Sequence, residues 1–133
     1  MDAQERTKLY ANYLAGEDNR PQVDSAGNIV FKFEGSTYVI IVDKNDPEYF
    51  CLMYPNFWPI NSPEEQTRAH IAAGTANRGS KVVKVLVDSR GEGVTAVVEG
   101  FYDQPEQSQP IFGRALRVLK YGVQVFVNEM LEG

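Results

Sequence analysis

The chain has 133 residues, of which 43% are hydrophobic and 23% are charged, and its net charge at pH 7 is −5. This length fits one domain, residues 1–133, which can bury about two thirds of the surface that the unfolded chain exposes. The single cysteine, Cys51, excludes an internal disulfide framework, and the acidic balance argues against a nucleic-acid backbone as ligand. The polar N-terminus and the lack of an apolar run of about 20 residues lead us to expect no signal peptide, no membrane span and a cytoplasmic location.

A first helix is predicted over residues 2–15. Asp2 fits the N-cap position and Glu5 follows three residues later, which is the spacing of a capping box. Large apolar side chains then recur along one helical stripe. Gly16 suits the position after the last turn, where a positive φ is common. A polar connector, residues 17–27, is expected to follow.

Residues 28–54 form the centre of the predicted fold. Three runs rich in β-branched and aromatic residues are separated by two turn signals, a pattern typical of an antiparallel meander. Gly35 and Ser36 fit a two-residue hairpin loop with glycine first, as a type II′ turn prefers. This register places six apolar residues on one face, in the cross-strand pairs Phe33–Tyr38, Phe31–Ile40 and Ile29–Val42.

The third strand of the meander is expected to stop at Pro55. Residues 54–60 hold four large apolar side chains, and two prolines are expected to keep them out of regular structure. Either these side chains hold a loop against the core, or they form a partly exposed apolar patch that receives a partner. The residues predicted to bind a partner are Tyr54, Phe57, Trp58 and Ile60.

A second helix is predicted from Ser62 to about Asn77. Ser62 fits the N-cap, a proline follows it, and Glu65 completes a capping box. The inner positions of this helix are small, which favours either tight packing inside the monomer or a helix pair across a homodimer. The predicted dimer-interface residues are Ala69, Ala72, Ala73 and Ala76.

Two further strands, residues 81–87 and 94–102, are joined by a glycine-bearing connection that is typical of a hairpin. A polar connector leads to a last helix, residues 111–131, with a sustained apolar stripe. The predicted fold class is therefore α+β: an antiparallel sheet of about five strands with three helices, in the order α-β-β-β-α-β-β-α.

The sequence shows no motif for catalysis or for binding a metal or cofactor. Cys51 and His70 are the only thiol and the only imidazole, so a conventional zinc site lacks ligands. The sequence predicts no catalytic residue, no metal and no cofactor. A basic stripe at Arg114, Arg117 and Lys120 fits a solvated helix face or docking to an acidic partner.

Several structural phrases resemble the bacterial sensory-transduction-regulator (YbjN) family, whose fold is similar to type III secretion chaperones. The residues that carry the resemblance are 27–38 (GNIVFKFEGSTY), 46–50 (DPEYF), 73–77, 84–87 (KVLV) and 97–101 (VVEGF). The resemblance implies a small, bacterial, non-enzymatic protein that dimerises through the second helix and its adjoining strand. It also implies an unfolded client segment that wraps around the outside, often adding a strand to the sheet.

The predicted function is therefore that of a chaperone-like or regulatory protein that forms a homodimer and binds a protein or peptide client, with neither nucleic acid nor membrane as partner. The alternative is a small-molecule-binding domain or small enzyme. Its pocket would lie between helix and sheet and could be lined by Tyr38, Tyr54 and Tyr102.

Overall fold

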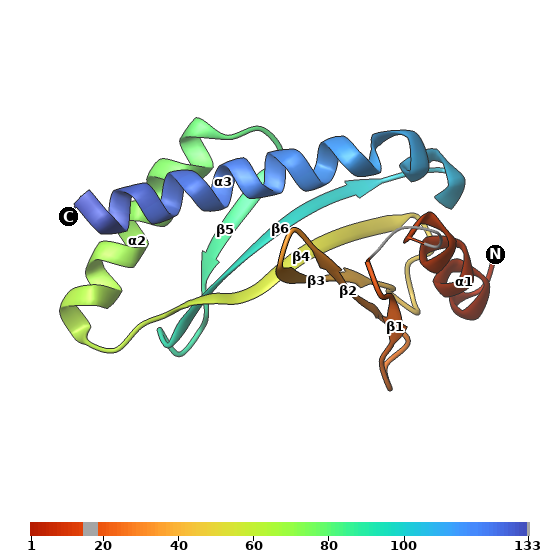
Figure 1. Cartoon of the computed structure of the whole chain (residues 1–133), viewed down its shortest axis with the longest axis horizontal. Coiled ribbons are helices and arrows are strands. Elements are labelled where there is room, and N and C mark those ends of the chain that lie inside the picture. The colour runs from red at the N-terminus through yellow and green to blue at the C-terminus, as the bar shows by residue number, and fades with distance from the viewer. Residues whose placement is uncertain (15–18, 133) are drawn as a thin grey trace. The chain divides into compact units, whose positions relative to one another are not determined.

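The computed structural model describes residues 1–14 and 19–132. This part of the chain is an α+β fold with three α-helices, a short 3-10 helix and a six-stranded antiparallel sheet of strand order β1-β2-β3-β4-β6-β5. The elements in chain order (Figure 1) are α1 (Ala3–Leu14), β1 (Gln22–Val23), β2 (Ile29–Phe33), β3 (Ser36–Ile41), β4 (Tyr49–Pro59), α2 (Pro63–Gly79), β5 (Val83–Val87), β6 (Gly93–Phe101), the 3-10 helix η1 (Pro105–Ile111) and α3 (Phe112–Glu132).

The predicted fold class is confirmed, with differences in detail. The short strand β1 and the helix η1 lie in segments that we expected to be polar connectors. Strand β4 runs to Pro59 rather than ending at Pro55. The predicted end of the first helix, at Ala15 and Gly16, lies outside the described residues.

The chain forms two compact units, a division that the sequence did not indicate. Unit 1 comprises Met1–Met53 and Glu99–Gly113, and unit 2 comprises Tyr54–Val98 and Arg114–Gly133. The chain passes from one unit to the other within β4, within β6 and at the start of α3.

In unit 1, helix α1 begins as its sequence predicts. Asp2 Oδ1 accepts a hydrogen bond of 2.8 Å from the backbone N–H of Glu5, and Glu5 Oε1 accepts one of 3.3 Å from the backbone N–H of Asp2. These two bonds form the capping box, which satisfies two of the N–H groups left free at a helix start. The helix buries Arg6, Tyr10 and Leu14, which are spaced four residues apart and so lie on one face.

The predicted β2–β3 register is wrong by two residues, although its apolar face is right. Phe31 pairs with Tyr38 and Phe33 pairs with Ser36, so Glu34 and Gly35 form the loop. Both loop residues have positive φ, 49° and 83°, as a type I′ turn requires. Because side chains alternate with a period of two, a two-residue shift keeps the same residues on the same face.

In unit 2, the predicted start of α2 is confirmed. Ser62 is the N-cap and its side chain accepts a hydrogen bond of 3.1 Å from the backbone N–H of Glu65. The predicted hairpin is also confirmed, since β5 and β6 pair antiparallel around a turn that starts at Asp88. Asp88 Oδ1 accepts hydrogen bonds from the backbone N–H groups of Arg90 and Glu92. These bonds lower the pKa of the Asp88 carboxyl.

Candidate functional site

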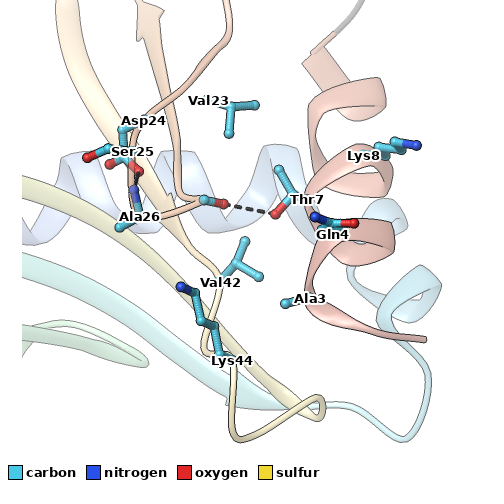
Figure 2. Close-up of a pocket in the computed structure, with 11 residues that line it drawn as sticks. Ala3, Gln4, Thr7, Lys8, Val23, Asp24, Ser25, Ala26, Val42 and Lys44 are labelled. Atoms are coloured by element: carbon cyan, nitrogen blue, oxygen red, sulfur yellow. Dashed lines mark hydrogen bonds between the residues drawn. The ribbon is translucent and has the colours of Figure 1, made fainter.

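Unit 1 contains an open cleft of about 550 Å³ between α1 and the turn that joins β1 to β2 (Figure 2). Three segments that are separate in the sequence form its walls. The lining residues are Ala3, Gln4, Thr7 and Lys8 from α1, residues 23–27 from the β1–β2 turn, and Val42 and Lys44 after β3. The cleft is therefore a product of folding rather than of any local motif.

The β1–β2 turn is held in place by its own side chains and by α1. Asp24 Oδ1 accepts hydrogen bonds of 2.9 Å from the backbone N–H groups of Ala26 and Asn28. Gly27 has a φ of 87°, which a glycine adopts at little cost. Thr7 Oγ1 donates a hydrogen bond of 2.8 Å to the carbonyl oxygen of Gly27, drawn as a dashed line in Figure 2. This bond attaches the turn to the helix, so the two sides of the cleft are fixed to each other.

The lining combines apolar side chains with two ammonium groups. Val42 is buried in the wall, whereas Val23 in β1 is 56% exposed. Lys8 and Lys44 are exposed, and neither makes an ion pair within the described residues. A surface of this kind suits a ligand with both an apolar group and a carboxylate, because an unpaired ammonium is a ready partner for an anion.

Arg6 is a second unusual feature of unit 1. Its side chain is 1% exposed, and Nη2 donates a hydrogen bond of 2.7 Å to the carbonyl oxygen of Asp43. Nε and Nη1 have no hydrogen-bond partner among the described residues. A buried cation with free donors costs folding free energy. Arg6 does not line the cleft, and we assign it no ligand.

The segment predicted to be an aromatic loop is the second half of strand β4, so that prediction is wrong. Asn56 has a φ of 47°, the left-handed conformation that is found at β-bulges, where proline is also tolerated. Tyr54 and Phe57 would lie on opposite faces of a regular strand, yet their rings stack with centroids 5.1 Å apart and an interplanar angle of 3°. The left-handed backbone at Asn56 interrupts the regular alternation of side chains and lets the two rings stack.

The aromatic side chains of this segment pack against α3 within unit 2. The rings of Phe57 and Trp58 lie edge-on to Phe126, at centroid distances of 5.5 and 5.8 Å, and Phe126 is fully buried. Ile60 is buried, while Tyr54, Phe57 and Trp58 keep part of their surface exposed. The structure thus gives these residues a packing role, and their predicted role in binding a partner stays a prediction.

The four alanines predicted to form a dimer interface are buried inside the chain. Ala69, Ala72, Ala73 and Ala76 are each at most 6% exposed, on the face of α2 that packs within unit 2. This corrects our choice between the two readings of the small residues, because they serve close packing within the monomer. A dimer formed through α2 would have to use other side chains, such as Ile71, which is 63% exposed.

The remaining side chains that could take part in catalysis or metal binding do not form a cluster among the described residues. Cys51 is buried in β4, and His70 is exposed on α2. Tyr49 donates a hydrogen bond to the Glu99 carboxylate, and burial together with this bond raises the pKa of Tyr49. In residues 1–14 and 19–132, no group of three or more His, Cys, Asp or Glu side chains is placed to hold a metal ion.

Tyr38, Tyr54 and Tyr102, proposed as the lining of a pocket, do not line the cleft. The residues that do line it were missed because the sequence marks only a polar connector there. The usable signal is the run from Asp24 to Gly27, since an aspartate followed by glycine three residues later favours a tight turn held by the aspartate side chain.

No helix in the described part of the chain is long and apolar enough to cross a membrane. In the comparisons with known proteins, no family model, no curated protein and no solved structure matches this chain. The resemblance to the YbjN family and to type III secretion chaperones therefore stays a prediction.

Proposed function

We propose that this protein is a non-enzymatic, chaperone-like or regulatory binding module that holds a segment of a partner protein. The observation that carries the proposal is the cleft of unit 1, with its apolar wall and two exposed lysines that make no ion pair with the described residues. The segment docks between α1 and the β1–β2 turn. One of its apolar side chains enters the cleft, and an acidic neighbour pairs with Lys8 or Lys44.

The position of the cleft in the sheet supports an extended segment as the occupant. Val23 belongs both to the cleft and to β1, the two-residue strand at one edge of the sheet. A sheet edge offers backbone groups to an incoming strand, and neighbouring pockets select its side chains. A segment that lies along β1 would therefore combine backbone hydrogen bonds with contacts inside the cleft.

We also propose that the protein forms a homodimer through unit 2. Large apolar side chains are exposed there on α2, on the loop after it and on β5: Ile71 (63%), Val82 (69%) and Leu86 (42%). Exposed apolar surface of this kind often marks an interface. Light scattering over a concentration series tests this part, and a monomer at micromolar concentration contradicts it.

The segment-binding proposal can be tested without knowing the client. A phage-displayed library of random peptides is selected on the immobilised protein, and binding of the enriched peptides is measured by fluorescence anisotropy. We expect peptides that combine an acidic with an apolar residue. Charge reversal in a Lys8→Glu, Lys44→Glu variant should weaken their binding at least about tenfold, because two attractive ion pairs become repulsive.

The matched control is charge reversal of two exposed bases on α3, Arg114→Glu and Arg117→Glu, which lie in a different unit. This variant should bind the peptides as the wild type does. Enriched peptides that bind both variants and the wild type equally would refute the cleft as the binding site.

A small ligand is the second candidate, favoured by the size of the cleft. Pockets for small molecules usually enclose roughly 300–1,000 Å³, and the cleft falls within this range. Thermal unfolding in the presence of a panel of small carboxylic acids tests this candidate. A rise in melting temperature that the Lys8→Glu, Lys44→Glu variant loses would favour a small ligand over a peptide segment.

A further inference from the structure

Strand β5 is the other edge of the sheet, and the direction of its backbone groups follows from its hydrogen bonds. Val85 pairs with Ala96 of β6 in an antiparallel register. In such a ladder, successive residues point their N–H and C=O groups alternately toward the partner strand and away from it. Both backbone groups of Val85 bond to a side chain outside the ladder, so they point away from β6 and toward the free edge.

That side chain is Asn77, from the last turn of α2. Asn77 Oδ1 accepts a hydrogen bond of 2.6 Å from the N–H of Val85, and Asn77 Nδ2 donates one of 3.1 Å to the carbonyl oxygen of Val85. A residue in a neighbouring antiparallel strand exchanges the same two bonds with its opposite residue. The carboxamide of Asn77 thus occupies the place of a peptide group of a seventh strand.

The short side chain of Asn77 reaches the strand because α2 lies close to β5. Residues of the two elements contact each other within unit 2. The buried face of α2 consists of four alanines, whose single methyl groups allow the helix backbone to approach closely. The small-residue face and the asparagine therefore act together: the alanines set the distance, and Asn77 makes the bonds.

We propose that Asn77 closes the β5 edge to strand addition. An unpaired edge strand of five residues with an exposed leucine is a template for another strand, and proteins protect such edges. Here the protection is a side chain that satisfies the donor and acceptor at the centre of the strand. An incoming strand has to break both bonds before it can pair with Val85. This inference is independent of the cleft and of the client proposed for it.

The test is to remove the carboxamide and measure self-association. Sedimentation velocity over a concentration series compares the wild type with Asn77→Ala. We expect the variant to form a larger species than the wild type, with an association constant raised at least about tenfold, because the two bonds no longer compete with a second copy of β5. The control is Asn128→Ala, since Asn128 is exposed on α3 and accepts a hydrogen bond from Gln124 of the same helix.

A second variant separates the loss of the two hydrogen bonds from the loss of side-chain volume. Asn77→Leu keeps the size of the side chain but cannot bond to Val85, so it should associate as Asn77→Ala does. Circular dichroism confirms that each variant is folded, which we expect because Asn77 is exposed and alanine and leucine are better helix formers. Folded Asn77→Ala and Asn77→Leu proteins that sediment as the wild type does at every concentration would overturn the proposal.

Discussion

The two edges of the sheet limit pairing with another strand in different ways. At one edge, β1 is only two residues long and both residues are exposed, so an incoming segment can form only a short ladder of backbone hydrogen bonds there. At the other edge, β5 has five residues, and Asn77 bonds to the backbone of its central residue. Because β1 is short, there is room for a cleft beside it. At β5, the side chain of Asn77 occupies the backbone groups of the central residue, so no free pairing site is left there. A sheet can therefore be closed to association at one edge and remain usable for binding at the other.

Alkaline pH should weaken unit 1 in particular. Burial raises the pKa of Tyr10 from 10.0 to about 12, and burial likewise raises the pKa values of Tyr13, Tyr49 and Tyr102, all in unit 1. An unfolded tyrosine loses its proton near pH 10, so the stability linked to Tyr10 is complete below that pH and is lost as the pH rises toward 12. The loss is about 2–3 kcal/mol for Tyr10 alone.

Amide hydrogen exchange at increasing pH, corrected for the intrinsic rate, can follow this loss separately in each unit. Exchange in α1 should accelerate before exchange in α2. The Tyr10→Phe variant is the control, because it lacks the ionisable group and should show a flatter pH dependence. If amide exchange accelerated equally in both helices, alkaline pH would not weaken unit 1 in particular.

The next largest effect on stability is expected where α3 packs closely against the start of β5. A Cβ atom at Gly122 of α3 would lie 2.7 Å from Cγ1 of Val83, which is too close for any real contact. The Gly122→Ala variant should therefore lose about 1–3 kcal/mol of unfolding free energy. Urea unfolding measures this loss. The control is Gly79→Ala, since a Cβ atom there meets nothing within 4 Å, and a loss of similar size in the control would contradict this explanation.

A smaller effect is expected at the β1 edge. The Asp24→Ala variant removes the acceptor of two backbone hydrogen bonds in an exposed turn and should cost about 1 kcal/mol. It should also weaken peptide binding, because the turn is one wall of the cleft. The neighbouring Ser25→Ala variant is the control for the effect on stability alone, because Ser25 is exposed in the same turn and itself lines the cleft. A stability unchanged by Asp24→Ala would contradict this explanation and show that the backbone bonds of the turn and the bond from Thr7 suffice to hold it.

The smallest effect on stability is expected for the lysines of the cleft. Replacing Lys44 by alanine should change the free energy of unfolding by less than about 0.5 kcal/mol, because this side chain is exposed and makes no ion pair with the described residues. The same variant should weaken the binding of acidic peptides. A large loss of stability would indicate that Lys44 supports the fold rather than the cleft.

The parts of this fold that the sequence predicted well are those determined by neighbouring residues. Both helix starts follow from an N-cap side chain, Asp2 or Ser62, that accepts a hydrogen bond from the backbone N–H three residues later. The capping box is complete only at Asp2, because Glu65 bonds to the N–H of Asn61 instead of that of Ser62. The turn at Gly35 was recognised but assigned to the wrong type, because glycine suits the first position of a type II′ turn and the second position of a type I′ turn equally. The prolines of β4 were misleading for a similar reason, since proline is also compatible with a bulged strand.

The functional features depend on distant residues and could not be predicted from local pattern. The cleft joins α1 to a turn about twenty residues further along, through the bond from Thr7 to Gly27. Asn77 reads as an ordinary polar residue near the end of a helix, and only the folded chain brings it to Val85. The alanines of α2 were read as a dimer surface because a small-residue face has the same sequence pattern in both settings.

The most direct test of the closed β5 edge is the hydrogen exchange rate of the Val85 amide, measured by NMR in the wild type and in Asn77→Ala at a concentration too low for association. Because the N–H of Val85 donates to Asn77 rather than to β6, its protection should depend on this one side chain. We predict that the exchange rate rises at least about fivefold in the variant, which corresponds to the loss of one hydrogen bond worth about 1 kcal/mol. The amide of Val97, which lies in the partner strand β6, should exchange at an unchanged rate. A Val85 amide that exchanges equally slowly in both proteins would contradict the account, because something other than Asn77 would then be closing the edge.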